Sequence, residues 1–384
     1  MIYLDHNATT PLLPEVTEAM LPFFHEKWGN PSSTYRFGSN LRSALEHSRE
    51  SVALLIGAYA PEVIFTGCAT ESNNAAIHAA IRSYPTRRRI VTSAVEHSSI
   101  LNYCKVLESE GYSVVYLPVD QSGQLDLADL REAVSSDTAI VSIMWANNET
   151  GVIFPIQEIS EFCKQQGVLF HTDAVQVAGK MSIDVSSIHV DYLSLAGHKI
   201  NGPKGVGALY INRKAPFKPY LYGGHQERGW RGGTSNVPLI VGMGKASEVA
   251  AKKALHFHSV VSPLRDELED GIVAALNGVV INGEHAPRLA NTSNLSISGV
   301  PSEALLLMLD QEGLCASSGS ACLAESDVPS HVIEAMKPTQ KAASEAVRLS
   351  LSHDTTRKEI LDAVRIISSS VKAIRGIGTK GAPN

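Results

Sequence analysis

Short runs of apolar, often β-branched residues alternate with stretches of helical pattern from about residue 40 to residue 213. Strands that are separated by helices usually pair in parallel, and the sheet they form is covered by helices on both faces. The sequence therefore predicts an α/β fold whose large domain has a mainly parallel sheet, with functional side chains on loops at the strand ends. The predicted strands cover residues 62–66, 90–93, 113–117, 139–145, 168–171, 192–195 and 207–211.

The pattern changes after residue 214. A glycine-rich stretch at residues 223–233 predicts a loop, and beyond it helices and strands no longer alternate regularly. We expect a large domain over residues 15–255 and a smaller α+β domain built from residues 1–14 and 256–384. In this region helices are predicted over residues 239–261, 264–276 and 303–312, with strands near residues 279 and 294 and at 346–351.

Two helices carry local signals at their ends. Ser302 is expected to cap the helix that starts at residue 303, and Gly313 is expected to end it. Thr356 and Glu359 have the spacing of a capping box, which predicts the start of the last helix.

Composition and charge exclude several classes of partner. With 384 residues, 44% of them hydrophobic, the chain can bury a core in each predicted domain. Its 33 basic and 39 acidic residues give a net charge of −6 without a broad basic face, so nucleic acid is not expected as a partner. The N-terminus lacks a basic segment followed by a long apolar one, and no apolar run could span a bilayer. We therefore expect a cytoplasmic protein without membrane association.

Two charged residues suggest a cofactor site. Lys199 follows the predicted strand at 192–195 beside small residues, where burial can lower the pKa of its amine enough to allow a Schiff base. Asp173 follows the neighbouring predicted strand, and a buried carboxylate there needs a cationic partner such as a protonated pyridine nitrogen. Taken singly, each residue has a plainer interpretation, as a surface lysine in a loop and as a turn-capping aspartate.

A phosphate and a flat ring would fit two further strand ends. The backbone N–H groups near Ala69 and Thr70, with the Thr70 hydroxyl, open a predicted helix and can bind a phosphate, although an ordinary helix cap has the same pattern. His97 follows another strand and could stack on a heterocycle, although a lone histidine is more often a hydrogen-bonded structural group.

Amide side chains gather at the remaining strand ends. Asn147 and Asn148 follow the strand at 139–145, and Gln176 lies three residues after Asp173. Amides that are buried together need partners, and a substrate carboxylate or a ring hydroxyl would satisfy them. Five strand ends are thus predicted to converge on one polar ligand.

At this point the sequence resembles the cysteine desulfurases of the NifS/IscS type. The resemblance runs from residue 3 to about residue 370 and implies a fold-type I, pyridoxal 5'-phosphate-dependent, class V aminotransferase-like homodimer. It is carried by seven motifs: Tyr3-Leu-Asp-His-Asn-Ala-Thr-Thr, Gly29-Asn-Pro-Ser-Ser, Ala69-Thr-Glu-Ser, Trp145-Ala-Asn-Asn-Glu-Thr-Gly, His171-Thr-Asp-Ala-Val-Gln, Gly197-His-Lys and Ser317-Ser-Gly-Ser-Ala-Cys.

The resemblance implies a role for each residue of the predicted site. Lys199 becomes the Schiff-base lysine, Asp173 the partner of the pyridinium nitrogen, and His97 the stacking residue and proton shuttle. Ala69, Thr70 and His198 would form the phosphate cup, and Gln176 and Asn148 would lie near the ring hydroxyl. Asn148 and Arg348 would bind the substrate carboxylate. Thr234 would reach the phosphate that is bound in the neighbouring subunit.

Cys322 is the residue whose interpretation changes most. The five cysteines form no C-x-x-C pair, so no structural zinc site, no other metal and no disulfide framework are expected. Residue pattern alone favours a buried, inert thiol at Cys322, whereas the resemblance makes it the sulfur carrier. The implied reaction converts L-cysteine to L-alanine and passes the sulfur, as a Cys322 persulfide, to an iron–sulfur scaffold protein or another acceptor.

Two departures from the family pattern leave alternatives open. Ala196 stands where relatives usually carry Ser or Cys, so one cofactor contact is missing, and Trp230 replaces a commonly basic residue. An inactive relative that binds a sulfur-transfer scaffold is one alternative. Selenocysteine lyase or another class V aminotransferase activity is the other, and a requirement for Cys322 would discriminate against it.

Overall fold

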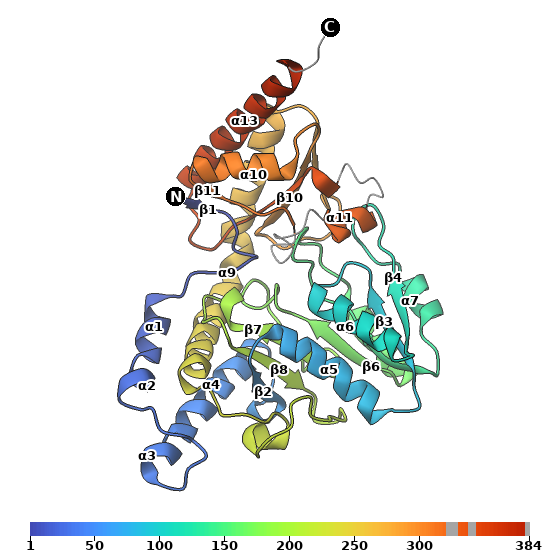
Figure 1. The fold of residues 1–384 in the computed structure, drawn as a ribbon, viewed down its shortest axis with the longest axis vertical. Coiled ribbons are helices and arrows are strands. Elements are labelled where there is room, and N and C mark those ends of the chain that lie inside the picture. The colour runs from blue at the N-terminus through green and yellow to red at the C-terminus, as the bar shows by residue number, and fades with distance from the viewer. Residues whose placement is uncertain (320–328, 337–342, 381–384) are drawn as a thin grey trace.

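The computed structural model describes residues 1–319, 329–336 and 343–380. Figure 1 shows a lower part built around a large sheet and an upper part built around two small sheets. The large sheet has seven strands in the order β2-β8-β7-β6-β5-β3-β4, and β8 alone is antiparallel to its neighbours. The predicted mainly parallel sheet is therefore confirmed. Its strands are β2 (Val63–Thr66), β3 (Arg89–Ser93), β4 (Ser113–Leu117), β5 (Thr138–Ser142), β6 (Leu169–Asp173), β7 (Tyr192–Ala196) and β8 (Gly207–Ile211).

Helices cover this sheet and bury its central strands completely. Every residue of β5, β6, β7 and β8 is buried, as expected for strands with helices on both faces. Helix α5 packs across β5, β7 and β8, and α8 packs against β6. The helices of this part are α1 (Pro14–Met20), α2 (Pro22–His25), α3 (Arg36–Ser39), α4 (Leu41–Leu55), α5 (Ala69–Ser83), α6 (Ser98–Ser109), α7 (Leu127–Ala133) and α8 (Ile156–Gln166).

The upper part is built on two small sheets. One is antiparallel in the order β12-β10-β9, and the other pairs β1 with β11 in parallel, so the N-terminus joins the C-terminal part of the chain. Leu4 accordingly belongs to the apolar core of this part. The elements are β1 (Ile2–Tyr3), β9 (Val279–Ile281), β10 (Thr292–Ile297), α10 (Ser302–Gln311), β11 (Leu314–Cys315), α11 (His331–Met336), β12 (Ala346–Ser350) and α13 (Arg357–Lys380).

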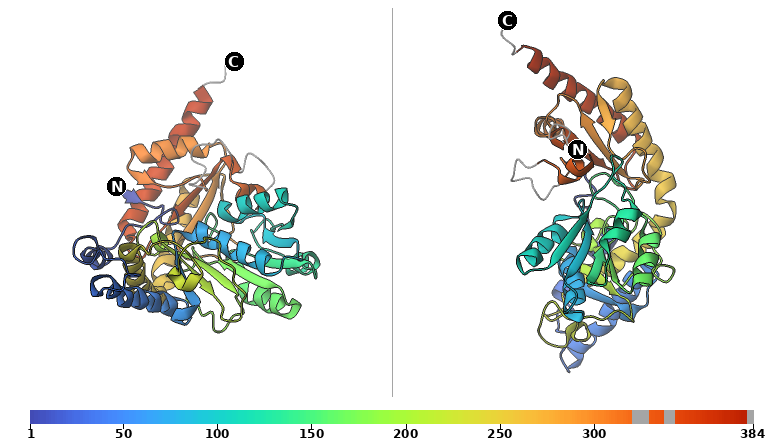
Figure 2. Two further views of the ribbon diagram at one scale, coloured as in Figure 1. Left: turned by 60° about the horizontal axis from the view of Figure 1, so that its bottom comes forward. Right: turned by 90° about the vertical axis from the view of Figure 1, so that its right-hand side faces the viewer.

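Helix α9 (Val237–Ala275) connects the two parts and corrects the prediction of two helices at 239–261 and 264–276. Pro263 lies inside it, although proline removes a hydrogen bond and crowds the carbonyl four residues earlier. The apolar stripe continues on both sides of the proline, with buried Val261 and Leu268 in the same core, and this burial keeps the helix continuous. In both views of Figure 2, α9 passes from the large sheet to the small ones.

The local signals were right at two of three helix ends. Gly313 follows α10 with a positive φ of 74°, and Thr356 and Glu359 form the predicted capping box, with donor–acceptor distances of 2.8 and 3.3 Å. The prediction for Ser302 was wrong, because Pro301 is the N-cap and Ser302 is the first helical residue. The side chain of proline has no hydrogen-bond acceptor, so no side-chain cap forms. The stretch at 223–233 is a loop with one short 3-10 turn, Gln226–Gly229.

The two parts have separate apolar cores: the large sheet has one cluster on each face, and a third cluster lies between α13 and the antiparallel sheet. The boundary predicted at residue 255 falls within α9, which both parts share. The division into two domains stays a prediction. In the described residues, no helix combines the length and the apolar character needed to cross a bilayer.

Buried Glu96 makes folding stability depend on pH. Its Oε1 accepts hydrogen bonds from Ser93 Oγ at 2.6 Å and from the Met144 N–H at 2.9 Å, and burial raises its pKa from 4.5 to about 8. Between these values the folded chain holds a proton that the unfolded chain releases, so this group stabilises the fold less as pH rises. Glu96→Gln removes the titration. We expect the free energy of unfolding of the variant, minus that of wild type, to increase by about 1 kcal/mol for each pH unit from pH 5 to 8.

Urea unfolding of both proteins at pH 5.5 and pH 8 checks this expectation. Each comparison is made at one pH, so the titration of all other groups cancels. An equal difference between the two proteins at both pH values would contradict the assignment of a protonated Glu96.

Candidate active site

Lys199 lies in the turn directly after β7, at the edge of the large sheet. Its Nζ donates to the backbone carbonyls of Asn7 at 2.5 Å and Ala8 at 2.7 Å. The lysine is therefore half-buried against the N-terminal segment and is not the freely exposed loop residue of the plainer interpretation.

Asp173 is the last residue of the adjacent strand β6 and is only 7% exposed. Its carboxylate accepts from Asn73 Nδ2 at 2.7 Å and from the Val175 N–H at 3.0 Å. Both partners are neutral, so within the described part of the chain this buried anion has no cationic hydrogen-bond partner. A protonated pyridine nitrogen would give the Asp173 carboxylate a cationic partner. This is the first indication that the residues fit pyridoxal phosphate.

His97 caps helix α6 at the end of the loop after β3. Its Nδ1 accepts from the Ser99 N–H at 3.2 Å, which leaves the proton of the neutral ring on Nε2. Burial lowers the pKa of His97; Lys199 and His331 lower it further, and Asp173 opposes them. His97 is thus within electrostatic reach of both Lys199 and Asp173, as the sequence predicted for their strand ends.

Helix α5 begins with an uncapped first turn. Its N-cap, Cys68, is extended and makes no side-chain hydrogen bond to the helix, so the N–H groups at Ala69 and Thr70 have no capping side chain. The N-terminus of a helix in this state binds phosphate readily. His198 lies beside Lys199; burial, first of all, lowers its pKa to about 4, so it remains a neutral donor and acceptor. This is the second feature that fits the cofactor.

The glycine-rich segment after β8 closes over the start of α5. Arg231 Nε donates to Glu71 Oε1 at 2.8 Å, and Glu71 Oε2 accepts from the Gly67 N–H at 2.7 Å. Exposed Thr234 and Gly67 line one cavity of about 250 Å³. The structure thus brings Thr234 and the turn at Gly67 of the same chain to one cavity. Its contact with a neighbouring subunit stays a prediction.

Asn7 joins the predicted residues to one another, although the sequence did not single it out. Besides Lys199, its carbonyl accepts from Gln176 Nε2 at 3.0 Å, and its own Nδ2 donates to the Asn148 carbonyl at 3.2 Å. The same amide reaches Thr292 Oγ1 of β10 at 2.9 Å. Gln176, Asn148 and Lys199 are therefore all held by one buried residue of the N-terminal segment, Gln176 and Lys199 through its backbone carbonyl and Asn148 through its side-chain amide.

Arg348 projects from β12 toward the same segment and is 1% exposed. It donates to Asp5 Oδ1 at 2.8 Å, to the Asn148 carbonyl at 3.0 Å and to the Gly319 carbonyl at 2.9 Å. Its Nε has no hydrogen-bond partner in the part of the chain that the structure describes. The structure thus brings Arg348 and Asn148 together, as predicted. The ion pair with Asp5 is a contact that sequence reasoning missed.

Glu149 contacts Gly319 and Ser330, which lie on either side of the predicted sulfur carrier Cys322 in the sequence. Its Oε2 lies 2.5 Å from Ser330 Oγ, and it also lies against Gly319, where an added Cβ would come within 2.4 Å of the same oxygen. Burial raises the pKa of Glu149. Cys322 itself lies outside the described residues. The four cysteines within them, Cys68, Cys104, Cys163 and Cys315, are all free thiols.

Comparison with known proteins places this geometry in a family. Residues 2–362 match the family described as aminotransferase class-V. The chain belongs to this family. Its class-V relatives include cysteine desulfurase 2 of Trichormus variabilis, which is 47% identical over 98% of this chain and 94% of the relative. The cysteine desulfurase NifS of Azotobacter vinelandii is 46% identical over 98% of this chain and 94% of that relative.

Solved structures agree with this class-V assignment. A NifS-like protein superposes with a TM-score of 0.90 at 36% identity, covering 97% of this chain and 99% of that one. SspA in complex with cysteine superposes with a TM-score of 0.81 at 34% identity, covering 93% and 100%. The predicted family, the fold-type I architecture and a pyridoxal-phosphate-dependent cysteine desulfurase are thereby confirmed.

Proposed function

We propose that this class-V protein converts L-cysteine to L-alanine at the site around Lys199 and passes the sulfur on as a persulfide of Cys322. The observation that carries the proposal is the buried carboxylate of Asp173, which has no cationic hydrogen-bond partner among the described residues and lies within electrostatic reach of His97. A site of this kind fits a ring with a protonated nitrogen and an aldehyde that a lysine can bond.

The residues would divide the binding of the cofactor among them. Lys199 holds it covalently, Asp173 retains the proton of the ring nitrogen, and His97 stacks on the ring. When bound, the cofactor supplies an electron sink for the pair left by the α-proton of the substrate. The phosphate is assigned to Ala69, Thr70 and His198, and the ring hydroxyl to Gln176 and Asn148.

The substrate is held by its carboxylate and attacked at its sulfur. Arg348 and Asn148 bind the carboxylate, and the neutral Lys199 amine removes the α-proton. The Cys322 thiolate forms a bond to the substrate sulfur as the carbon–sulfur bond breaks, and the electron pair of that bond stays with the carbon. Protonation of this carbon gives the methyl group of alanine, and His97 is placed to move a proton.

The remaining assignments concern assembly and setting. We propose the domain division at residues 15–255, with residues 1–14 and 256–384 forming the small domain, and a cytoplasmic homodimer in which Thr234 completes the partner's phosphate site. The sulfur acceptor is an iron–sulfur scaffold protein or a component of a thiolation pathway. Selenocysteine lyase or another class V aminotransferase activity is the second candidate, because the same cofactor site could serve it.

Product analysis tests the activity directly. Purified protein with bound cofactor should release alanine and, in the presence of a thiol reductant, sulfide in equal amounts from L-cysteine. Protein that shows the cofactor's visible absorbance but releases neither product would contradict the proposal.

A further inference from the structure

Lys180 is a second lysine buried at this site, only 7% exposed, and the proposed reaction does not use it. Its Nζ donates to Gln176 Oε1 at 2.9 Å and to Asn7 Oδ1 at 3.1 Å. Both acceptors are neutral amides, whereas a buried ammonium is usually paired with a carboxylate. Such a residue is costly to bury and therefore requires an explanation.

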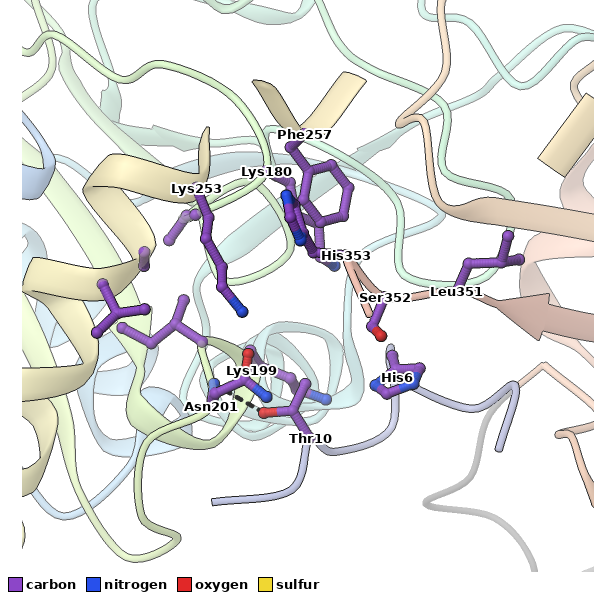
Figure 3. Close-up of a pocket in the computed structure, with 15 residues that line it drawn as sticks. His6, Thr10, Lys180, Lys199, Asn201, Lys253, Phe257, Leu351, Ser352 and His353 are labelled. Carbon is purple, nitrogen blue, oxygen red and sulfur yellow. Dashed lines mark hydrogen bonds between the residues drawn. The ribbon is translucent and has the colours of Figure 1, made fainter. Parts of the chain in front are cut away.

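The two lysines are linked through Asn7. Lys180 binds its side-chain oxygen, and Lys199 binds its backbone carbonyl at 2.5 Å. Both lysines also line one small cavity of about 40 Å³, together with His6, Lys253 and others. Figure 3 shows these side chains around the cavity; they come from the N-terminal segment, the segments after β6, β7 and β12, and α9.

The charges around Lys180 are mostly positive. Burial, Lys199 and Arg348 lower its pKa to about 7, and Lys180 in turn helps burial to lower the pKa of His6 to about 4. The other titratable groups that line the cavity are Lys253 and His353, and the flanking carboxylates, Asp5 and Asp354, pair with Arg348 and Lys253. Repulsion between two cations is mutual, so a charge on Lys180 disfavours a proton on Lys199.

We propose that Lys180 is a positioning residue of the cofactor site: it fixes the amides of Gln176 and Asn7, and its positive charge keeps a proton off the nitrogen of Lys199. The inference rests on the proposed role of Lys199. Only the neutral amine can bond the cofactor's aldehyde carbon, using its lone pair and releasing one water. Lys199 also has two oxygen acceptors, the carbonyls of Asn7 and Ala8, so the effect of Lys180 on the reactive nitrogen is the repulsion between the two charges.

The first test is a pH titration of the visible band of the holoenzyme. In Lys180→Met the midpoint should move up by about one unit, because a neighbouring cation is lost. Lys180→Arg, which keeps the charge, should move it back toward the wild-type value. Lys253→Met is the matched control, because this lysine lines the same cavity but is 27% exposed and pairs with Asp354, so its loss should shift the midpoint far less.

A second test needs no variant of Lys180. In wild-type protein freed of cofactor, competitive acylation at a series of pH values followed by peptide mass spectrometry reports the pKa of Lys199. We expect a midpoint at least about one unit below the ordinary lysine value of roughly 10.4. If Lys180→Met fails to fold, an ordinary midpoint for Lys199 in this experiment would still overturn the role of Lys180.

The outcomes separate this inference from the proposed function. A visible band whose midpoint is the same in Lys180→Met and wild type, or an ordinary midpoint for Lys199 in the acylation experiment, would overturn the role of Lys180 alone. A wild-type protein that never forms the band would instead overturn the role of Lys199.

Discussion

Replacing Lys199 by alanine is expected to abolish the visible band of the bound cofactor and to lower L-cysteine turnover by about 10⁴-fold or more. The variant loses both the covalent attachment and the base that removes the α-proton. The carbonyls of Asn7 and Ala8, which accept from Lys199 Nζ, are backbone groups of the N-terminal segment, and water can replace the amine there. The fold should therefore survive the substitution.

Absorbance spectra and alanine release check this expectation together. Lys199→Arg keeps the positive charge but cannot form the bond, so it should fail like Lys199→Ala. Lys204→Ala is the matched control, because this lysine is exposed in the same loop, five residues further along the chain. A normal band in Lys199→Ala would show that another group holds the cofactor.

Replacing Cys322 by serine should separate cofactor chemistry from sulfur transfer. We expect an unchanged visible band and a loss of sulfide and alanine formation of about 10³-fold or more, because a hydroxyl is far less nucleophilic than a thiolate toward sulfur. Cys315→Ser is the control, since Cys315 is a free thiol in β11 that is given no role.

Retained turnover in Cys322→Ser would contradict the persulfide route. It would favour the second candidate, selenocysteine lyase or another class V aminotransferase activity, because neither needs a carrier thiol. A lost band would point to a structural role for Cys322.

The site residues that lie at the ends of strands could be predicted from the sequence. Asp173, His97 and Lys199 each follow an apolar run, and parallel strands bring such ends to one edge of a sheet. The same local reasoning failed at Pro263, because the burial of α9 against two cores depends on tertiary packing that a breaker residue does not reveal.

The residues that connect the site could not be found in this way. Asn7 contacts Thr292, 285 residues away, and Arg348 pairs with Asp5, 343 residues away, so no local pattern relates them. Lys180 follows a glycine after a predicted strand and resembles a surface lysine until the N-terminal segment covers it. Their roles follow from which segments pack together, and only the fold shows that.

Reduction of the holoenzyme with sodium borohydride, followed by peptide mass spectrometry, tests the central assignment most directly. Borohydride converts the carbon–nitrogen double bond between cofactor and lysine into a stable single bond, which marks the lysine permanently. We predict the pyridoxyl phosphate group on the peptide that contains Lys199 and on no other. Its presence on Lys180, or on any other lysine, would contradict the account.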